Sequence, residues 1–227
     1  DDHRSLPAHW RLAGHATAAV WALHWLNGLP LLHFGSFSLE LGLYGWLIGL
    51  LGLIWLLNLY NFMDGIDGIA SLQAITVAVG AIACSFAVGI DDFLLPLLLA
   101  TAVSGFLPWN FPKSRIFMGD AGSGFLGITL GILMLSAAQQ QPLMLWGWLI
   151  LLGVFIVDAS WTLLRRLCRG ENLAQAHRSH AYQKWALSCR SHARVSLSVG
   201  AVNLIWLLPL AWLAVTGNIN PIAALII

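Results

Sequence analysis

Seven long apolar runs divide the chain and limit what it can fold into. They cover about residues 12–30, 39–59, 69–89, 93–109, 124–140, 143–164 and 195–216. Each approaches the ~20 apolar residues that an α-helix needs to cross a bilayer. Only 9% of the residues are charged, against about 25% in a typical soluble domain. The sequence therefore predicts an all-α fold, a polytopic transmembrane helical bundle of about seven spans, as one membrane-embedded domain over residues 1–227.

The cations are segregated along the chain. All eleven lysines and arginines lie in three connecting segments, 1–11, 110–121 and 165–194. With seven spans these segments share one side of the membrane, and the loops on the opposite side contain no cation. Because cytoplasmic loops are enriched in Lys and Arg, the basic side is predicted to face the cytoplasm. Residues 58–70 fall on that same side.

The segment "NLYNFMDGIDGIA", residues 58–70, places polar side chains directly after an apolar run. Asn58, Asn61, Asp64 and Asp67 follow one another at spacings of three. A single Asp at the end of a span can simply cap a helix. Several carboxylates and amides that converge at a membrane edge instead favour a hard cation such as Mg²⁺, which takes one or two carboxylates, water and substrate phosphates. The segment is therefore a candidate site.

Two further segments on the same side carry polar groups. In "NFPKSRIFMGDAGSG", residues 110–124, Asp120 sits where a new span begins, and a helix N-terminus can bind phosphate. A plain loop-to-helix turn is the alternative. In "AHRSHAYQ", His177, Arg178 and His180 favour a phosphate-binding group over ordinary surface residues. Asp158 lies inside a span and is interpreted as structural, with a buried partner. The remaining histidines, His192 among them, show no supporting pattern.

Four segments in this order resemble the signatures of one family. They are "DD" at residues 1–2, "NLYNFMDGIDGIA", "NFPKSRIFMGDAGSGFLG" and "HRSHAY". They resemble the polyprenyl-phosphate N-acetylhexosamine-1-phosphate transferases of glycosyltransferase family 4, and look most like the bacterial members that initiate O-antigen or other surface polysaccharides. The resemblance implies transfer of a sugar 1-phosphate from a UDP-sugar to undecaprenyl phosphate, with release of UMP. It also implies Mg²⁺, or Mn²⁺ as the alternative ion, and a cytoplasmic site in a bacterial inner (plasma) membrane.

The resemblance also implies roles for single residues. Asp1 and Asp2 resemble the pair that acts at the acceptor phosphate, with Asp1 the better candidate for a base. Asp64 and Asp120 resemble the metal-binding aspartates, and Asp64 thereby also counts as catalytic. Asn61 is expected beside them.

The resemblance places the donor in the same region. Asp67, Asn110 and Phe117 look like uridine-binding positions, with Phe117 stacking on uracil. His177, Arg178 and His180 resemble the cytoplasmic histidine motif near the diphosphate, with the two histidines catalytic and Arg178 binding substrate.

One departure leaves rivals open. Members of the family usually begin with about three further spans before the paired aspartates, so this chain is expected to lack them. An inactive fragment or a scaffold is therefore one alternative. A membrane transporter with ionisable relay residues is another, although its site would lie nearer the bilayer midplane. The expected partners are the donor, the lipid acceptor and the bilayer, without nucleic acid; a homodimer is left open.

Overall fold

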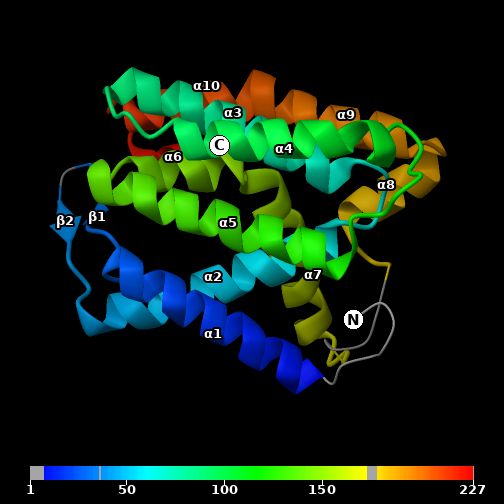
Figure 1. Cartoon of the computed structure of the whole chain (residues 1–227), viewed down its shortest axis with the longest axis horizontal. Helices are drawn as coiled ribbons and strands as arrows, with labels where there is room; N and C mark the ends of the chain where they lie inside the picture. Colours follow the sequence, from blue (N-terminus) through cyan, green and yellow to red (C-terminus); the bar gives the residue numbers. More distant parts are fainter. Residues whose placement is uncertain (1–7, 36, 173–177, 227) are drawn as a thin grey trace.

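The computed structural model describes residues 8–35, 37–172 and 178–226, and this part of the chain is almost entirely helical (Figure 1). Apart from turns and loops, the described residues contain one short antiparallel hairpin, β1 (Leu32–His33) with β2 (Ser38–Leu39). The helices are α1 (Ala8–Leu26), α2 (Leu43–Met63), α3 (Ile69–Val88), α4 (Leu94–Asn110), α5 (Gly119–Gln140), α6 (Met144–Leu151), α7 (Gly153–Cys168), α8 (Ala181–Cys189), α9 (His192–Val202), the π-helix η1 (Asn203–Leu207), α10 (Leu208–Val215) and α11 (Pro221–Ile226). The predicted all-α membrane bundle is confirmed.

Four helices of the described chain are long and apolar enough to cross a bilayer. They are α2, α3, α5 and the continuous rod from α9 through η1 to α10. The pair α6 and α7 makes a fifth candidate, but the two helices are bent by 68° at the break between them. The predicted span over 143–164 thus corresponds to a bent helix pair, and its crossing of the bilayer as one span stays a prediction. The predicted total of about seven spans stays a prediction, since α4 has 17 residues and α1 does not reach the required length and hydropathy together.

Two predicted boundaries are displaced by four residues. α1 covers 8–26 instead of 12–30, because the left-handed backbone at Asn27 and Gly28 ends it. α2 covers 43–63 instead of 39–59, since β2 and the turn at Gly42 occupy the residues before it. The second shift matters for the site: Asn58 and Asn61 lie on the last turns of α2, not in the loop beyond it.

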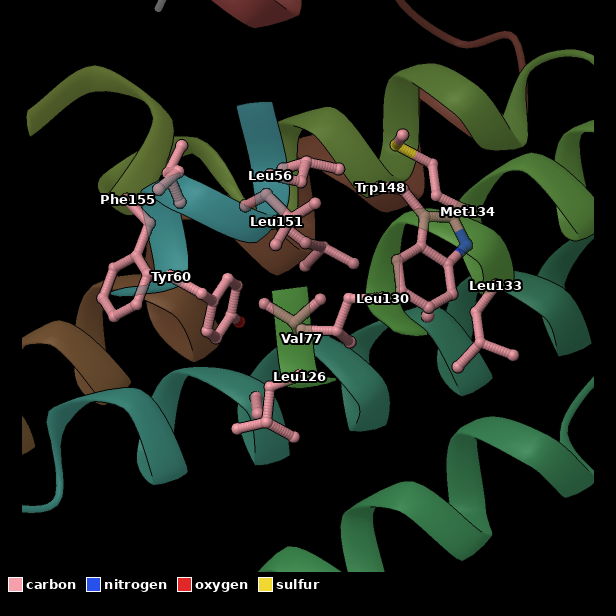
Figure 2. Close-up of a cluster of buried hydrophobic side chains, with 14 of the residues drawn as sticks. Leu56, Tyr60, Val77, Leu126, Leu130, Leu133, Met134, Trp148, Leu151 and Phe155 are labelled. Carbon is pink, nitrogen blue, oxygen red and sulfur yellow. The ribbon is translucent and has the colours of Figure 1, made fainter. Parts of the chain in front are cut away.

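Small residues let α2 and α5 approach closely. A Cβ atom on Gly127 would lie 2.5 Å from the Leu56 carbonyl oxygen, so only glycine fits at this crossing. Close backbone approach at small residues is typical of helix pairs in membranes. Around the crossing, buried apolar side chains from several helices form one core (Figure 2). Tyr60 of α2 packs against Phe155 of α7 there, with ring centroids 5.1 Å apart.

A buried polar network stabilises the break between α6 and α7. The Leu151 carbonyl accepts a hydrogen bond from Gln73 Nε2 at 3.3 Å. Asn203 Nδ2, at the start of η1, donates to Gln73 Oε1 at 2.9 Å and to Thr76 Oγ1 at 2.8 Å. Non-helical backbone at membrane depth is tolerated only where protein groups satisfy it. The network does this, and the bend directs α7 toward α8.

Candidate active site

A cavity of about 210 Å³ gathers polar residues from four separated parts of the chain. It lies where α2 and α4 end and α5 and α9 begin; the α4–α5 connection and α8 lie at one end of the bundle, on the right in Figure 1. Its lining is Asn61, Asp64, Gly65, Ile66, Asp67, Asn110, Phe117, Met118, Gly119, Asp120 and His192. The structure therefore brings together six of the residues that the sequence nominated.

Asp64 follows the last residue of α2, is half-buried and lines this cavity. Burial and, to a smaller extent, the negative charge of nearby Asp120 together raise the pKa of its carboxyl to about 7. A carboxylate that is partly desolvated beside a second carboxylate is stabilised by a cation. The next residue, Gly65, has no room for a side chain, because a Cβ there would collide with the Tyr182 hydroxyl.

Asp120 stands in the first turn of α5, across the cavity from Asp64. Its Oδ2 lies 3.2 Å from Arg11 Nη1 of α1. Both side chains are more than two-fifths exposed, so the ion pair contributes little to stability. Asp120 is thus close to solvent, whereas Asp64 is enclosed.

Asp67 is held by α9, which lies more than a hundred residues further along the chain. Its Oδ2 is 3.0 Å from His192 Nδ1, and its backbone carbonyl accepts a hydrogen bond from Ser196 Oγ at 2.8 Å. His192 and Ser196 are one helical turn apart and so share a face of α9. Sequence reasoning missed His192, since a histidine distant in sequence from every motif gives no signal of its partner.

Asn110 and Phe117 flank the cavity in different ways. Asn110 is buried: its Oδ1 accepts from Ser71 Oγ and its Nδ2 donates to the Ile116 carbonyl, both at 3.1 Å. It therefore holds the segment that carries Phe117, in addition to lining the cavity. Phe117 is 79% exposed, so one face of its ring is free to receive a flat ligand. Close by, Gly68 adopts a φ of +73° against the ring of Phe111.

The histidine motif does not line this cavity in the described part of the chain. Asp1, Asp2 and His177 lie outside the described residues, and Arg178 is exposed. His180 is buried, with Nδ1 3.2 Å from Asp158 Oδ1. The buried partner predicted for Asp158 is confirmed, and its structural role stays a prediction.

Asp158 also caps α8. Its two carboxylate oxygens accept hydrogen bonds from the backbone N–H groups of Ala181 and Tyr182, both at 2.9 Å. The Tyr182 hydroxyl then donates to the Phe62 carbonyl at 3.0 Å, next to the cavity. Burial raises the pKa of Tyr182, and the charges of Asp158 and Asp64 add to this, so the phenol stays a neutral donor. His180 thus connects to the cavity through α8 and Tyr182.

The sequence matches one known family over most of its length. A family model described as glycosyl transferase family 4 matches residues 1–138. The chain belongs to this family.

Several curated proteins are similar to the chain. It is 30% identical over 114 residues to the "Probable undecaprenyl-phosphate N-acetylglucosaminyl 1-phosphate transferase" of Bacillus subtilis, covering 49% of this chain and 32% of that protein. It is 31% identical over 119 residues to the "Decaprenyl-phosphate N-acetylglucosaminephosphotransferase" of Mycolicibacterium smegmatis, covering 47% and 29%. It is 34% identical over 95 residues to the "Phospho-N-acetylmuramoyl-pentapeptide-transferase" of Chlamydia muridarum, covering 40% and 27%. The matches thus span about a third of the length of these relatives.

The cavity of this family 4 protein offers two carboxylates for a metal ion. Within residues 8–35, 37–172 and 178–226, no three His, Cys, Asp or Glu side chains form a ready-made metal site. Mg²⁺ does not need one, because it often takes one or two carboxylates and completes its shell with water and substrate phosphates. The raised pKa of Asp64 beside Asp120 marks the position where a divalent ion would be stabilised. The donor set fits Mg²⁺ in the presence of a diphosphate.

A second, larger cavity of about 990 Å³ lies on the other side of Tyr182, between α7, α8, η1 and α11. Its lining is mostly apolar and includes the exposed side chains of Val157, Trp161 and Trp206. Arg165, Arg169 and Lys184 line it as well, and all three are exposed. We refer to it as the α7 groove. The α7 groove thus combines apolar side chains with cations.

Asn58, the first polar residue of the segment 58–70, lines neither cavity. Its Nδ2 donates to the Ile54 carbonyl of its own helix.

Proposed function

We propose that the chain is the catalytic part of an enzyme that transfers an N-acetylhexosamine 1-phosphate from a UDP-sugar to undecaprenyl phosphate and releases UMP. The product would start a surface polysaccharide such as an O-antigen. The observation that carries the proposal is the 210 Å³ cavity, where Asp64 and Asp120 face the candidate donor-binding residues. Family membership and the printed names of the relatives, which act on undecaprenyl and decaprenyl phosphates, support the reaction class.

The proposed reaction is a phosphoryl transfer. An oxygen of the acceptor phosphate attacks the β-phosphorus that bears the sugar, and the bond from this phosphorus to the bridging oxygen breaks as UMP leaves. Asp64 and Asp120 would hold Mg²⁺, which when bound neutralises charge on the diphosphate. The other residues position the reactants, the main contribution of the protein in this chemistry. Phe117 would stack on the base, while Asp67 would accept a hydrogen bond from it.

The acceptor has an apolar chain and an anionic head, and the α7 groove suits both parts. The apolar wall around Val157, Trp161 and Trp206 would receive isoprene units. Arg165, Arg169 and Lys184 would attract the phosphate. Tyr182 lines the groove, and its hydroxyl is bonded beside the metal-binding loop. A lipid that enters from the bilayer would therefore approach the donor from this side.

The site is proposed to face the cytoplasm of a bacterial inner membrane. The segregation of all eleven lysines and arginines into three segments supports this orientation. A cysteine introduced at Ser114, in the α4–α5 connection, should be shielded from an impermeant thiol reagent in intact cells. Labelling of this cysteine in intact cells would indicate the opposite orientation in the membrane.

The test is an activity assay on the protein purified in detergent. A panel of UDP-sugars is incubated with undecaprenyl phosphate and Mg²⁺, and UMP release is measured. UMP should form only when both substrates and a divalent ion are present. Asp120→Asn should lose nearly all activity, whereas Asp92→Asn, a matched acid in the α3–α4 connection, should retain it. Full activity in EDTA would exclude a metal requirement. The absence of UMP release with every donor would reject the proposed function.

A further inference from the structure

His192 contacts Asp67, a candidate uridine-binding residue, in the 210 Å³ cavity. Its Nδ1 lies 3.0 Å from Asp67 Oδ2, and both side chains line the cavity. His192 is 48% exposed whereas Asp67 is 18% exposed, so the imidazole lies outside the carboxylate. The backbone N–H of Asp67 also lies 3.5 Å from the same Nδ1. Since an ionised carboxylate only accepts hydrogen bonds, we assign the proton to Nδ1 for the shorter contact with Oδ2. The imidazole therefore donates and the carboxylate accepts.

This contact leaves one oxygen of Asp67 available. In the described part of the chain, Asp67 Oδ1 has no hydrogen-bond donor, while Oδ2 is taken by His192. The backbone of Asp67 has a further contact with α9, because Ser196 Oγ donates to its carbonyl at 2.8 Å. One face of α9 thus fixes the backbone through Ser196 and the side chain through His192. Asp67 lines the cavity, so Oδ1 is the oxygen left to accept a hydrogen bond from a ligand there.

We propose that His192 is a positioning residue for base recognition: it holds Asp67 Oδ2 so that Oδ1 accepts the ring N–H of the donor's uracil. The inference rests on the proposed function, because it assumes that a UDP-sugar occupies the cavity. His192 acts through Asp67 and needs no contact with the reacting phosphorus.

The chemistry of the base gives the pair a selective role. Uracil carries a hydrogen on N3, which a carboxylate oxygen can accept. Cytosine carries a lone pair at N3, which a carboxylate oxygen repels. A site built to pair with a donor rejects an analogue that lacks it, because its own polar group stays unpaired. A carboxylate fixed by His192 should separate the two bases better than a mobile one.

The experiment compares the binding of UDP and CDP, each with Mg²⁺, to the detergent-purified full-length protein by calorimetry. In His192→Ala the Kd for UDP should rise about tenfold, as expected for a weakened hydrogen bond to a charged group, with little change for CDP. His192→Asn, whose amide can donate from nearly the same position, should retain most of the preference for UDP. In the transferase assay, His192→Ala should raise KM for the donor and leave kcat within about twofold.

Ser196→Ala is the matched control, because it removes the neighbouring anchor of the same loop. It should lower the melting temperature but leave the ratio of the UDP and CDP affinities unchanged. An unchanged ratio in His192→Ala, or an equal loss for UDP and CDP, would overturn the role of His192. If the unaltered protein binds UDP no better than CDP, the uridine donor of the proposed function fails, and the inference fails with it.

Discussion

Two aspartate–histidine pairs of nearly equal length serve different purposes in this protein. The Asp67–His192 pair spans 3.0 Å and the Asp158–His180 pair 3.2 Å. The second pair is 9% and 2% exposed, respectively, whereas the first is 18% and 48% exposed. Asp158 is saturated, because two backbone N–H groups, Thr162 Oγ1 and His180 all approach its carboxylate. Asp67 keeps one oxygen available. The two pairs have nearly the same N–O distance and differ in unused hydrogen-bonding capacity. This capacity distinguishes Asp67, a candidate ligand site, from Asp158, a structural link.

The largest effect is expected from removing the saturated carboxylate. Asp158→Ala removes the carboxylate that buried His180 contacts, and with it the acceptor of two backbone N–H groups of α8. Breaking a buried pair from one side costs about 3–5 kcal/mol. Asp67→Ala should cost about 1 kcal/mol or less, because water can reach its partner. Thermal unfolding in detergent measures both, and equal losses of stability would erase the distinction between the two pairs.

The next effect concerns pH and the enclosed acid Asp64. Its pKa is raised from 3.8 to about 7 in the folded protein, so the folded state holds a proton that the unfolded state has lost over this range. Stability without a divalent ion should therefore fall as pH rises from about 4 to about 7. The upper limit of this loss is about 4 kcal/mol, at about 1.4 kcal/mol for each pH unit.

Asp64→Asn should abolish most of this pH dependence. The melting temperature of the metal-free protein at pH 5 and pH 8 is the measurement, with Asp67→Asn as the control that keeps it. Added Mg²⁺ should restore stability at pH 8 in the unaltered protein and not in Asp64→Asn. A melting temperature that rises with pH without metal would contradict the assignment.

A smaller effect, on kcat/KM, is expected when Asp67 of the partly exposed pair loses its charge. Asp67→Asn should raise KM for the UDP-sugar and reduce kcat/KM about ten- to hundredfold, since one hydrogen bond of a buried polar group is worth about 1–3 kcal/mol. The turnover number should change little, because the contact holds ground and transition states alike. Asp64→Asn should instead depress kcat. Measuring kcat and KM on the purified variants separates the two roles. Normal kinetics with lowered stability in both Asp64→Asn and Asp67→Asn would indicate that the two aspartates only cap helices.

The smallest effect should come from the uncharged network at the α6–α7 break. Gln73→Leu removes the donor to the Leu151 carbonyl and the acceptor for Asn203. Hydrogen bonds between membrane helices average about 0.6 kcal/mol, so the melting temperature should fall only slightly. Thr101→Val on α4 is the matched control, because that hydroxyl bonds only within its own helix. If Gln73→Leu lowered the melting temperature as much as Asp158→Ala, the α6–α7 bend would contribute as much to stability as the cap of α8.

The sequence by itself determined the class of fold and most of the site. Apolar runs near twenty residues long impose membrane helices, whatever their partners, because unpaired backbone groups cannot face lipid. The spacing of Asn61, Asp64 and Asp67 at the end of such a run, with Asp120 at the start of another, was enough to predict one polar cluster. These are local signals, readable without knowing which helices are neighbours.

Tertiary structure alone decided how each polar group is used. His192 reaches Asp67 across 125 positions, His180 is buried on Asp158, and Asn110 holds the Phe117 segment; nothing in the local sequence specifies these contacts. The break after Leu151 likewise depends on Gln73 from another helix. Burial and hydrogen-bond partners are set by helices that meet only after folding, so the same residue types became a structural link in one place and a candidate ligand site in another.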